Sequence, residues 1–229
     1  MRLEWRLMPT ATVIFDLDGT LVDSAPEITA VMERSWEAVL PGSRFPRERF
    51  RVGPPLVEAV AALDPALAPA QREALAAAFR QLYDASDFSR TVPYAGVEAL
   101  LDLLSARGVC CCLATNKRRA PTLAITARWF PNRFDRIACT DGVWPDDGTL
   151  GLENKAAMLG WLVRASGQAS RQAVMVGDAA SDIAAARAAG TRAVAVTWGN
   201  DEAQALVAAG PDAVVHEVGS LLAALDLSS

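Results

Sequence analysis

The stretch "TVIFDLDGTLVDS", residues 12–24, decides the fold class and raises the question of function. Its apolar start, Val13 to Phe15, has no polar alternation and predicts a short buried strand. Asp16 and Asp18 follow, two residues apart, and side chains along a strand repeat with a period of two. Both carboxylates are therefore expected to emerge on one side, where their repulsion calls for a nearby cation or a shared proton.

Composition limits the classes of protein that the chain can belong to. It has 229 residues, of which 52% are hydrophobic and 21% charged, as in an ordinary globular protein of one large or two small domains. The net charge of −5 argues against a nucleic acid polymer as partner. No apolar run approaches the roughly 20 residues that cross a bilayer. The opening "MRLEWRLMPT", with Met8 as an alternative start, lacks the features of a signal peptide, so we expect a cytoplasmic protein without a membrane partner.

Three scarce residue types narrow the chemistry further. His216 is the only histidine, which disfavours a histidine metal site or a Ser-His-Asp triad. The four cysteines, at 110–112 and 139, have no CxxC spacing and are expected to be buried free thiols. Only Lys117 and Lys155 among the 22 basic residues are lysines. Lysine supplies a compact point charge where arginine supplies a planar fork, so both positions are of interest.

Strands and helices alternate over most of the chain, which predicts an α/β fold with a parallel sheet covered on both faces. After the first strand, further strands are expected at 109–114, 136–139, 173–177, 192–197 and 213–215. Helices are expected at 25–40, 54–63, 69–86, 96–106, 119–129, 153–165, 180–189, 201–209 and 219–226. No strand is predicted among the helices between 22 and 89. We therefore predict an α/β catalytic core from 1–21 and 90–229, with 22–89 inserted after the first strand as a small α-helical cap domain.

Polar residues follow the carboxyl ends of the predicted strands, where open parallel sheets bind ligands. They comprise Asp16, Asp18, Thr115, Asn116, Asp178 and Asp182, with Lys155 near the start of a helix. Such a set suits magnesium-assisted phosphoryl transfer, because Mg²⁺ prefers carboxylate and phosphate oxygens. One carboxylate can attack phosphorus, a second can carry the proton, and a lysine can offset negative charge.

Four ordered motifs resemble those of the haloacid dehalogenase superfamily, in the branch with a helical cap: "DLDGTLVDS", "TNK", Lys155 and "GDAASD". The resemblance implies a Rossmann-like core and a Mg²⁺-dependent phosphatase with Asp16 as nucleophile and Asp18 as general acid and base. It also implies metal ligation by Asp16, the Asp18 backbone carbonyl and Asp178, with Asp182 in support. The remaining residues that it marks are Thr115 and Lys155 for the phosphoryl group, Asn116 for orientation, and Gly19 and Thr20 as further phosphate or substrate contacts.

Two basic residues each have two interpretations. Lys117 and Arg51 are candidate substrate contacts, and a solvent-exposed position is the alternative for each.

The segments "VGPPLVEAV", "VPYAGV", "TNK" and "VTWGN" are most similar to phosphoglycolate phosphatases and related nucleotidases. The expected substrate is accordingly a small phosphate ester, and the expected protein a monomer or homodimer. A 5′-nucleotidase, a sugar phosphomutase and a regulatory phosphate-binding module without turnover remain alternatives. Ala179 stands where these relatives commonly carry Ser or Thr, and Lys155 lacks their commoner Lys-Pro context.

Each motif also has a purely structural interpretation. Asp16 and Asp18 can form a turn, Thr115 and Asn116 can cap a helix, Lys155 can be a solvated helix charge, and Asp178 and Asp182 can favour a helix N-terminus. A competing chemistry is the C-x5-R spacing of Cys112 and Arg118, as in cysteine phosphatases. The loop between them lacks glycine, and the apolar neighbours of Cys112 are expected to raise the pKa of its thiol. The tryptophans, including Trp144, are expected to pack in the core or in the cap.

Overall fold

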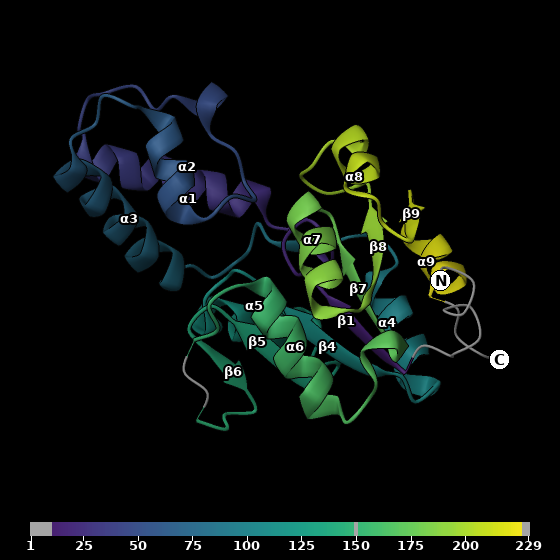
Figure 1. Ribbon diagram of the computed structural model, residues 1–229. Helices are drawn as coiled ribbons and strands as arrows, with labels where there is room; N and C mark the ends of the chain where they lie inside the picture. The colour runs from purple at the N-terminus through teal and green to yellow at the C-terminus, as the bar shows by residue number, and fades with distance from the viewer. Residues whose placement is uncertain (1–10, 149–150, 226–229) are drawn as a thin grey trace. The chain divides into compact units, whose positions relative to one another are not determined.

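The computed structural model describes residues 11–148 and 151–225, so Met8 and the end of the expected helix 219–226 lie outside it. Contacts divide the chain into two compact units (Figure 1). The first comprises the residues up to Asp23 and those from Pro93 onward, and it contains the sheet. The second, Ser24–Val92, is helical.

A mostly parallel sheet forms the centre of the first unit. Its strand order is β6-β5-β4-β1-β7-β8-β9, so the strand of the opening motif lies in the middle. All neighbouring pairs are parallel except β5 and β6, which are antiparallel. The strands are β1 (Thr12–Phe15), β4 (Cys110–Ala114), β5 (Arg136–Cys139), β6 (Gly142–Trp144), β7 (Ala173–Gly177), β8 (Arg192–Val196) and β9 (Ala213–Val215). The α/β fold predicted from the sequence is confirmed.

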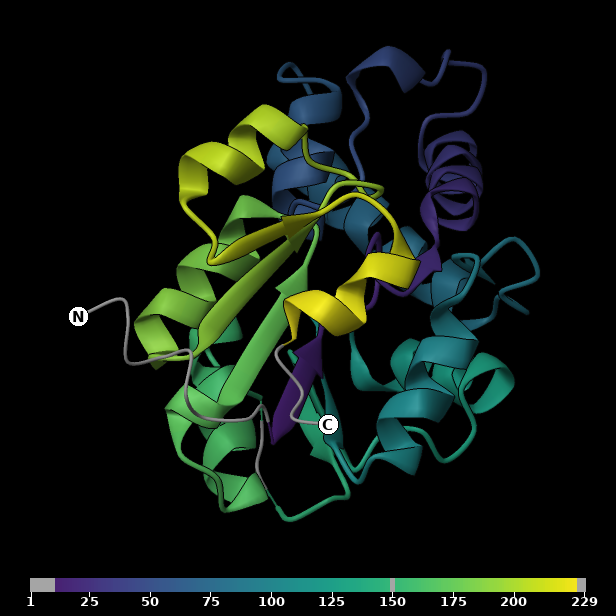
Figure 2. The same cartoon turned by 90° about the vertical axis from the view of Figure 1, so that its right-hand side faces the viewer.

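Helices cover both faces of this sheet, which explains why its strands are apolar without alternation. In Figure 2, α6 (Lys155–Ser166) and α7 (Ala180–Ala189) lie on one face, and α4 (Val97–Ala106) and α9 (Leu221–Ala224) lie on the other. The remaining helices of the unit are α5 (Arg119–Trp129) and α8 (Ala203–Ala209). A continuous apolar cluster joins the central strands to α6 and α7 and includes Ile14, Met158, Leu162, Met175 and Ile183, each at most 2% exposed. This packing fixes the strand ends that carry the polar residues.

The helical unit has an apolar core of its own. It contains α1 (Ala25–Val39), α2 (Leu56–Leu63), α3 (Pro69–Asp84) and a short 3-10 helix at Arg47–Arg49. Their buried residues include Met32, Trp36, Val60, Leu63 and Leu75. Within the described ranges, no helix combines the length and the apolar character that a membrane span requires.

Several features differ from the sequence-based expectations, and one is the antiparallel edge strand β6, which was not predicted. The short strands β2 (Val22–Asp23) and β3 (Val92–Pro93) form a separate two-stranded sheet that two residues of pattern do not reveal. α2 begins at Leu56, after both prolines, because proline supplies no N–H and restricts the residue before it. Trp144 is 36% exposed on the edge strand β6, so the expectation that it packs in the core or in the cap is wrong.

Candidate active site

The opening motif ends β1 and turns sharply at its carboxyl end. The Asp16 N–H still belongs to the sheet, donating to the Val176 carbonyl at 2.9 Å. Beyond it the Leu17 carbonyl accepts from the N–H groups of the next turn, and Gly19 N donates to the Val22 carbonyl. Gly19 has a φ of +85°, which favours glycine. The turn leaves the Asp16 side chain at the sheet edge, where the residue is only 8% exposed.

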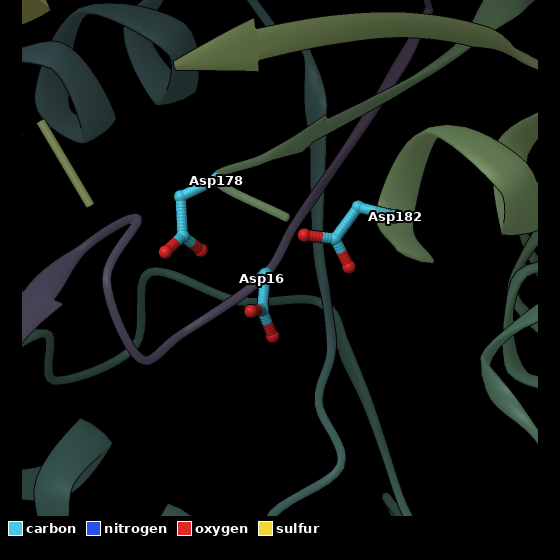
Figure 3. A group of neighbouring side chains, drawn as sticks. All are labelled: Asp16, Asp178 and Asp182. Atoms are coloured by element: carbon cyan, nitrogen blue, oxygen red, sulfur yellow. The ribbon is translucent and has the colours of Figure 1, made fainter. Parts of the chain in front are cut away.

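Two further carboxylates come from the end of β7. Asp178 directly follows the strand, and Asp182 lies in the first turn of α7, where its Oδ2 accepts from the Ala179 N–H at 3.1 Å. Asp16, Asp178 and Asp182 each offer an oxygen, and these atoms lie within 4.8 Å of one another. Figure 3 shows the three carboxyl groups gathered around one space from separate segments. Hard oxygen donors this close, and buried, are the donor set that a divalent cation such as Mg²⁺ requires.

Lys155 is the cation that the structure places against this group. Its Nζ lies 3.0 Å from Asp16 Oδ1 and 2.6 Å from Asp182 Oδ1, and the residue is 7% exposed. Asn154 caps α6 by accepting from the Ala157 N–H, which fixes the first residue of the helix. Burial by itself lowers the pKa of Lys155, but the two carboxylates outweigh it and raise the pKa. The interpretation of Lys155 as a solvated helix charge is therefore wrong.

One lysine does not balance the buried negative charge. Burial raises the pKa of Asp16 to about 8, although the nearby Lys155 acts to lower it. The carboxylates of Asp182, Asp178 and Asp18, in that order, raise it further. Burial also raises the pKa of Asp178 to about 6, against the lowering effect of the Asn200 N–H. Without a metal, burial thus shifts Asp16 and Asp178 toward their protonated forms, and a bound dication would favour the ionised forms.

The second lysine pairs with the second aspartate. Lys117 Nζ lies 3.0 Å from Asp18 Oδ1, and the side chains are 6% and 19% exposed. The solvent-exposed alternative for Lys117 is therefore wrong. The Lys117 N–H donates to Thr115 Oγ1 at 3.2 Å, so the loop after β4 is folded onto its own threonine.

Three other predicted residues, Thr115, Asn116 and Thr20, lie in the same unit. Thr115 is 1% exposed, and its N–H donates to the Ala138 carbonyl, which places it directly beyond β4. Asn116 is exposed. Neither residue is the N-cap of α5, which is Arg118, so the helix-cap interpretation is wrong. Thr20 is buried and donates from Oγ1 to Asp178 Oδ1 at 3.0 Å.

Three glycines make room for the carboxylates. A Cβ on Gly19 would lie 2.1 Å from Asp178 Oδ2, and one on Gly199 would lie 2.3 Å from the same oxygen. A Cβ on Gly177 would lie 2.2 Å from Asp182 Oδ2. No side chain fits at these distances, so the group of carboxylates depends on glycine at each position.

Asn200 is a residue of the site that the sequence analysis missed. Its N–H and its Nδ2 both donate to Asp178 Oδ2, at 2.7 and 3.0 Å. Beside it, Trp198 Nε1 donates to the Thr20 carbonyl at 3.0 Å. Both residues follow β8 in the segment "VTWGN". Polar residues that follow a strand line the edge of a parallel sheet, and this rule predicts a site position there.

Arg51 lies in the other unit, and Cys112 lies inside the sheet. Arg51 belongs to the helical unit, where it is exposed and donates to the carbonyls of Glu48 and Phe50. Cys112 is fully buried in the sheet, and its hydrogen bond with Cys110, together with burial, raises the pKa of its thiol. A buried, protonated thiol is a poor nucleophile, which argues against the C-x5-R chemistry. All four cysteines are free, as expected.

Comparisons with known proteins agree with this geometry. Residues 10–190 match the haloacid dehalogenase-like hydrolase family. A phosphoglycolate phosphatase of Pseudomonas putida is 31% identical over 221 residues, which cover 92% of this chain and 78% of that protein. The phosphoglycolate phosphatase of Photobacterium profundum is 27% identical over 94% of this chain and 96% of its own. A solved structure of a haloacid dehalogenase-like family hydrolase from Streptococcus pneumoniae covers 93% of this chain and 97% of its own, at 25% identity and a TM-score of 0.81.

The family match spans most of the chain and includes all the motifs from Asp16 to Asp182. The relative from Photobacterium profundum and the solved structure from Streptococcus pneumoniae each align with more than nine tenths of the chain. The chain is therefore an enzyme of the haloacid dehalogenase-like hydrolase family.

Proposed function

We propose that the chain is a magnesium-dependent phosphatase of small phosphomonoesters that works through an aspartyl-phosphate on Asp16. The observation that carries this proposal is the position of Asp16. It is buried at the end of the central strand, with Lys155 Nζ 3.0 Å from Oδ1 and the carboxylates of Asp178 and Asp182 beside it. Lys155, together with a dication held by these carboxylates, would offset the negative charge as Asp16 approaches a phosphate dianion.

Mg²⁺ fits the residues that are present, because the carboxylates supply several hard oxygens in one buried space. Asp16, Asp178 and the Asp18 backbone carbonyl would hold the ion, with Asp182 in support. When bound, Mg²⁺ would supply positive charge that offsets the negative charge of the carboxylates and of the phosphate. This charge also favours the ionised form of Asp16, which is the form that attacks.

In the first half of the reaction, an Asp16 oxygen attacks phosphorus and the ester P–O bond breaks. Asp18 gives its proton to the departing alkoxide, so the alcohol leaves neutral. In the second half, Asp18 takes a proton from water as the water oxygen attacks phosphorus. The Asp16–phosphorus bond then breaks, which regenerates the carboxylate and releases inorganic phosphate. Lys155 and Thr115 would bind the phosphoryl oxygens during both halves.

Phosphoglycolate is the substrate that we propose, because a relative 31% identical over 92% of the chain is named phosphoglycolate phosphatase. We further propose that residues 22–89 act as a cap domain that selects the substrate, with Arg51 as a candidate partner for the carboxylate of glycolate. Nucleoside monophosphates and hexose phosphates belong in the same screen, since they test the nucleotidase and mutase alternatives.

The decisive experiment measures p-nitrophenyl phosphate hydrolysis with Mg²⁺ and with EDTA, in the parent and in Asp16→Asn and Cys112→Ala variants. We expect hydrolysis that needs Mg²⁺, disappears in Asp16→Asn and persists in Cys112→Ala. Full activity in Asp16→Asn would refute the proposal, and loss confined to Cys112→Ala would favour the cysteine chemistry. Stable phosphorylation of Asp16 without release of phosphate would indicate a regulatory module instead.

A further inference from the structure

The two lysines of the sequence are divided between the two aspartates of "DLD". Lys155 lies 3.0 Å from Asp16, and Lys117 lies 3.0 Å from Asp18. All 20 other basic residues are arginines, which present a planar fork where a lysine presents one compact charge. Each carboxylate with a separate proposed task therefore has its own ammonium group.

The burial of Lys117 indicates that its contact with Asp18 is a specific ion pair and not a chance surface contact. An exposed lysine that meets an aspartate contributes little, because water competes for both charges. The Lys117 side chain is only 6% exposed, however, and is more buried than that of Asp18 at 19%. Removing an ammonium group this far from water is costly unless a carboxylate accepts from it. The burial of its ammonium group thus favours a conformation in which Lys117 stays paired with Asp18.

The backbone around Lys117 is held in place as well. Its N–H donates to Thr115 Oγ1 at 3.2 Å, and its carbonyl accepts from the Thr140 N–H at 3.4 Å. These bonds join the loop after β4 to its own threonine and to the end of β5. The ammonium group is therefore presented from a fixed loop, as orienting another side chain requires.

We propose that Lys117 is a positioning residue that holds the carboxyl group of Asp18 in the orientation from which it donates a proton to the leaving group. This inference rests on the proposed phosphatase function and assigns Lys117 a role through Asp18 in place of a direct contact with substrate. Lys155 pairs with Asp16 and Asp182, whereas Lys117 pairs with Asp18.

The role predicts a characteristic dependence on the leaving group. Phenyl phosphate releases a poor leaving group that needs a well-placed proton donor, whereas p-nitrophenyl phosphate releases a good one. The two esters differ only in the para nitro group. In Lys117→Met we expect kcat/KM to fall about 100-fold for phenyl phosphate and less than about 10-fold for p-nitrophenyl phosphate, within the range of general acid catalysis. Lys117→Arg keeps the charge and should recover part of the loss.

The ratio of the two kcat/KM values is taken on one protein sample, so a fraction of misfolded Lys117→Met enzyme cancels out. Arg119→Met is the matched control. It also removes a positive charge next to the loop, but from an exposed pair with Asp146. We expect it to leave the ratio unchanged. A ratio that stays at the parent value in Lys117→Met overturns the proposal, since a general structural role would lower both rates together.

A double-mutant cycle separates action through Asp18 from direct action on the substrate. In an Asp18→Asn background, Lys117→Met should change kcat/KM for phenyl phosphate less than about 2-fold. An equal loss in both backgrounds would mean that Lys117 acts on the substrate itself, which overturns the positioning role. Full activity in Asp16→Asn would overturn the proposed function and this inference together. An inactive Asp16→Asn with an unchanged ratio in Lys117→Met overturns this inference alone.

Discussion

Asn200 donates two hydrogen bonds to one oxygen of Asp178, from its N–H at 2.7 Å and from its Nδ2 at 3.0 Å. The other Asp178 oxygen accepts from Thr20 Oγ1 at 3.0 Å. Both oxygens are thus held before any ion binds, and the carboxylate needs little reorganisation to act as a ligand. Groups that orient a ligand in this way contribute to metal affinity although they do not touch the metal.

Replacing Asn200 should therefore weaken metal binding. Asn200→Ala keeps the N–H bond to Asp178 but removes the Nδ2 bond. We expect the Mg²⁺ dissociation constant to rise by about 10-fold or more, as is typical for a partner of a ligand. Isothermal titration of the metal-free protein with Mg²⁺ measures this without reference to activity.

Thr197→Val is the matched control for that variant. Thr197 lies three residues earlier, and its Oγ1 bonds to His216 Nδ1 at 2.9 Å, so its loss removes a hydrogen bond of the same region without touching Asp178. Its Mg²⁺ affinity should match the parent. Equal affinities in Asn200→Ala and the parent would show that the side-chain bond does not orient the ligand.

Most of the site could be predicted from one rule, namely that residues directly after the strands of a parallel sheet meet at one edge. Asp16, Thr115 and Asp178 all follow a strand of a parallel sheet, and the topology alone brings such positions to one edge. Asn200 obeys the same rule after β8. It was missed because an amide in a glycine-containing loop is also an ordinary turn residue.

Burial is the property that the sequence could not supply. Lys117 lies three residues beyond the end of β4, in a loop. From the sequence its side chain could point to solvent or into the site, because the direction of a loop side chain depends on tertiary contacts. Its partner Asp18 lies 99 residues earlier in the chain. Trp144 shows the reverse error, since its size predicts burial but the short antiparallel strand β6 leaves it 36% exposed at the sheet edge.

Gly19 provides a test of the space around the carboxylates. In Gly19→Ala the Cβ would lie 2.1 Å from Asp178 Oδ2 and 2.3 Å from Asn200 Nδ2, so both side chains must move. We expect kcat/KM to fall by at least about 100-fold, because misplacing groups by about 1 Å has effects of this size. Steady-state hydrolysis of p-nitrophenyl phosphate measures the loss.

Gly108→Ala controls for backbone strain. Gly108 has a φ of +70°, close to the +85° of Gly19, but a Cβ there meets nothing within 4 Å. Alanine at this position should destabilise the protein by about 1 kcal/mol and leave kcat/KM unchanged. If both variants lost activity equally, strain alone would explain the effect and the steric role of Gly19 would be wrong.

The buried carboxylates predict how the stability of the metal-free protein depends on pH. The folded protein holds the proton of Asp16 up to a pKa of about 8, whereas an unfolded aspartate releases it near pH 4. The folded state therefore binds more protons between these values, and stability is lost as the pH rises through that window. Asp178, with a pKa of about 6, acts in the same direction. Thermal unfolding in EDTA should give a lower Tm at pH 8 than at pH 5.5.

Asp16→Asn should remove most of this pH dependence and raise the Tm of the metal-free protein at pH 8, because a neutral amide replaces the buried charge. The expected gain is about 1 kcal/mol or more, given that one pKa unit corresponds to about 1.4 kcal/mol. Asp102→Asn removes an exposed carboxylate paired with Arg133 and should leave the pH dependence unchanged. A metal-free parent whose Tm rises from pH 5.5 to 8 would contradict the prediction.

Glu27 provides a test within the helical unit. It is 6% exposed near the start of α1, where its carboxylate accepts from Ser86 Oγ at 2.5 Å and from the Arg90 N–H at 2.9 Å. These bonds tie the beginning of the unit to the segment that follows α3. In Glu27→Ala both donors lose their acceptor, which should destabilise the unit by about 1–3 kcal/mol.

Amide hydrogen exchange of α1 and α3 measures this local stability without requiring the whole chain to unfold in one step. Glu33→Ala is the matched control, since Glu33 lies on the same helix but is exposed, and its loss should change protection by less than about 0.5 kcal/mol. Glu27→Gln keeps one oxygen acceptor, so its protection should lie between that of Glu27→Ala and that of Glu33→Ala. Equal protection in Glu27→Ala and Glu33→Ala would show that the two hydrogen bonds do not hold the unit together.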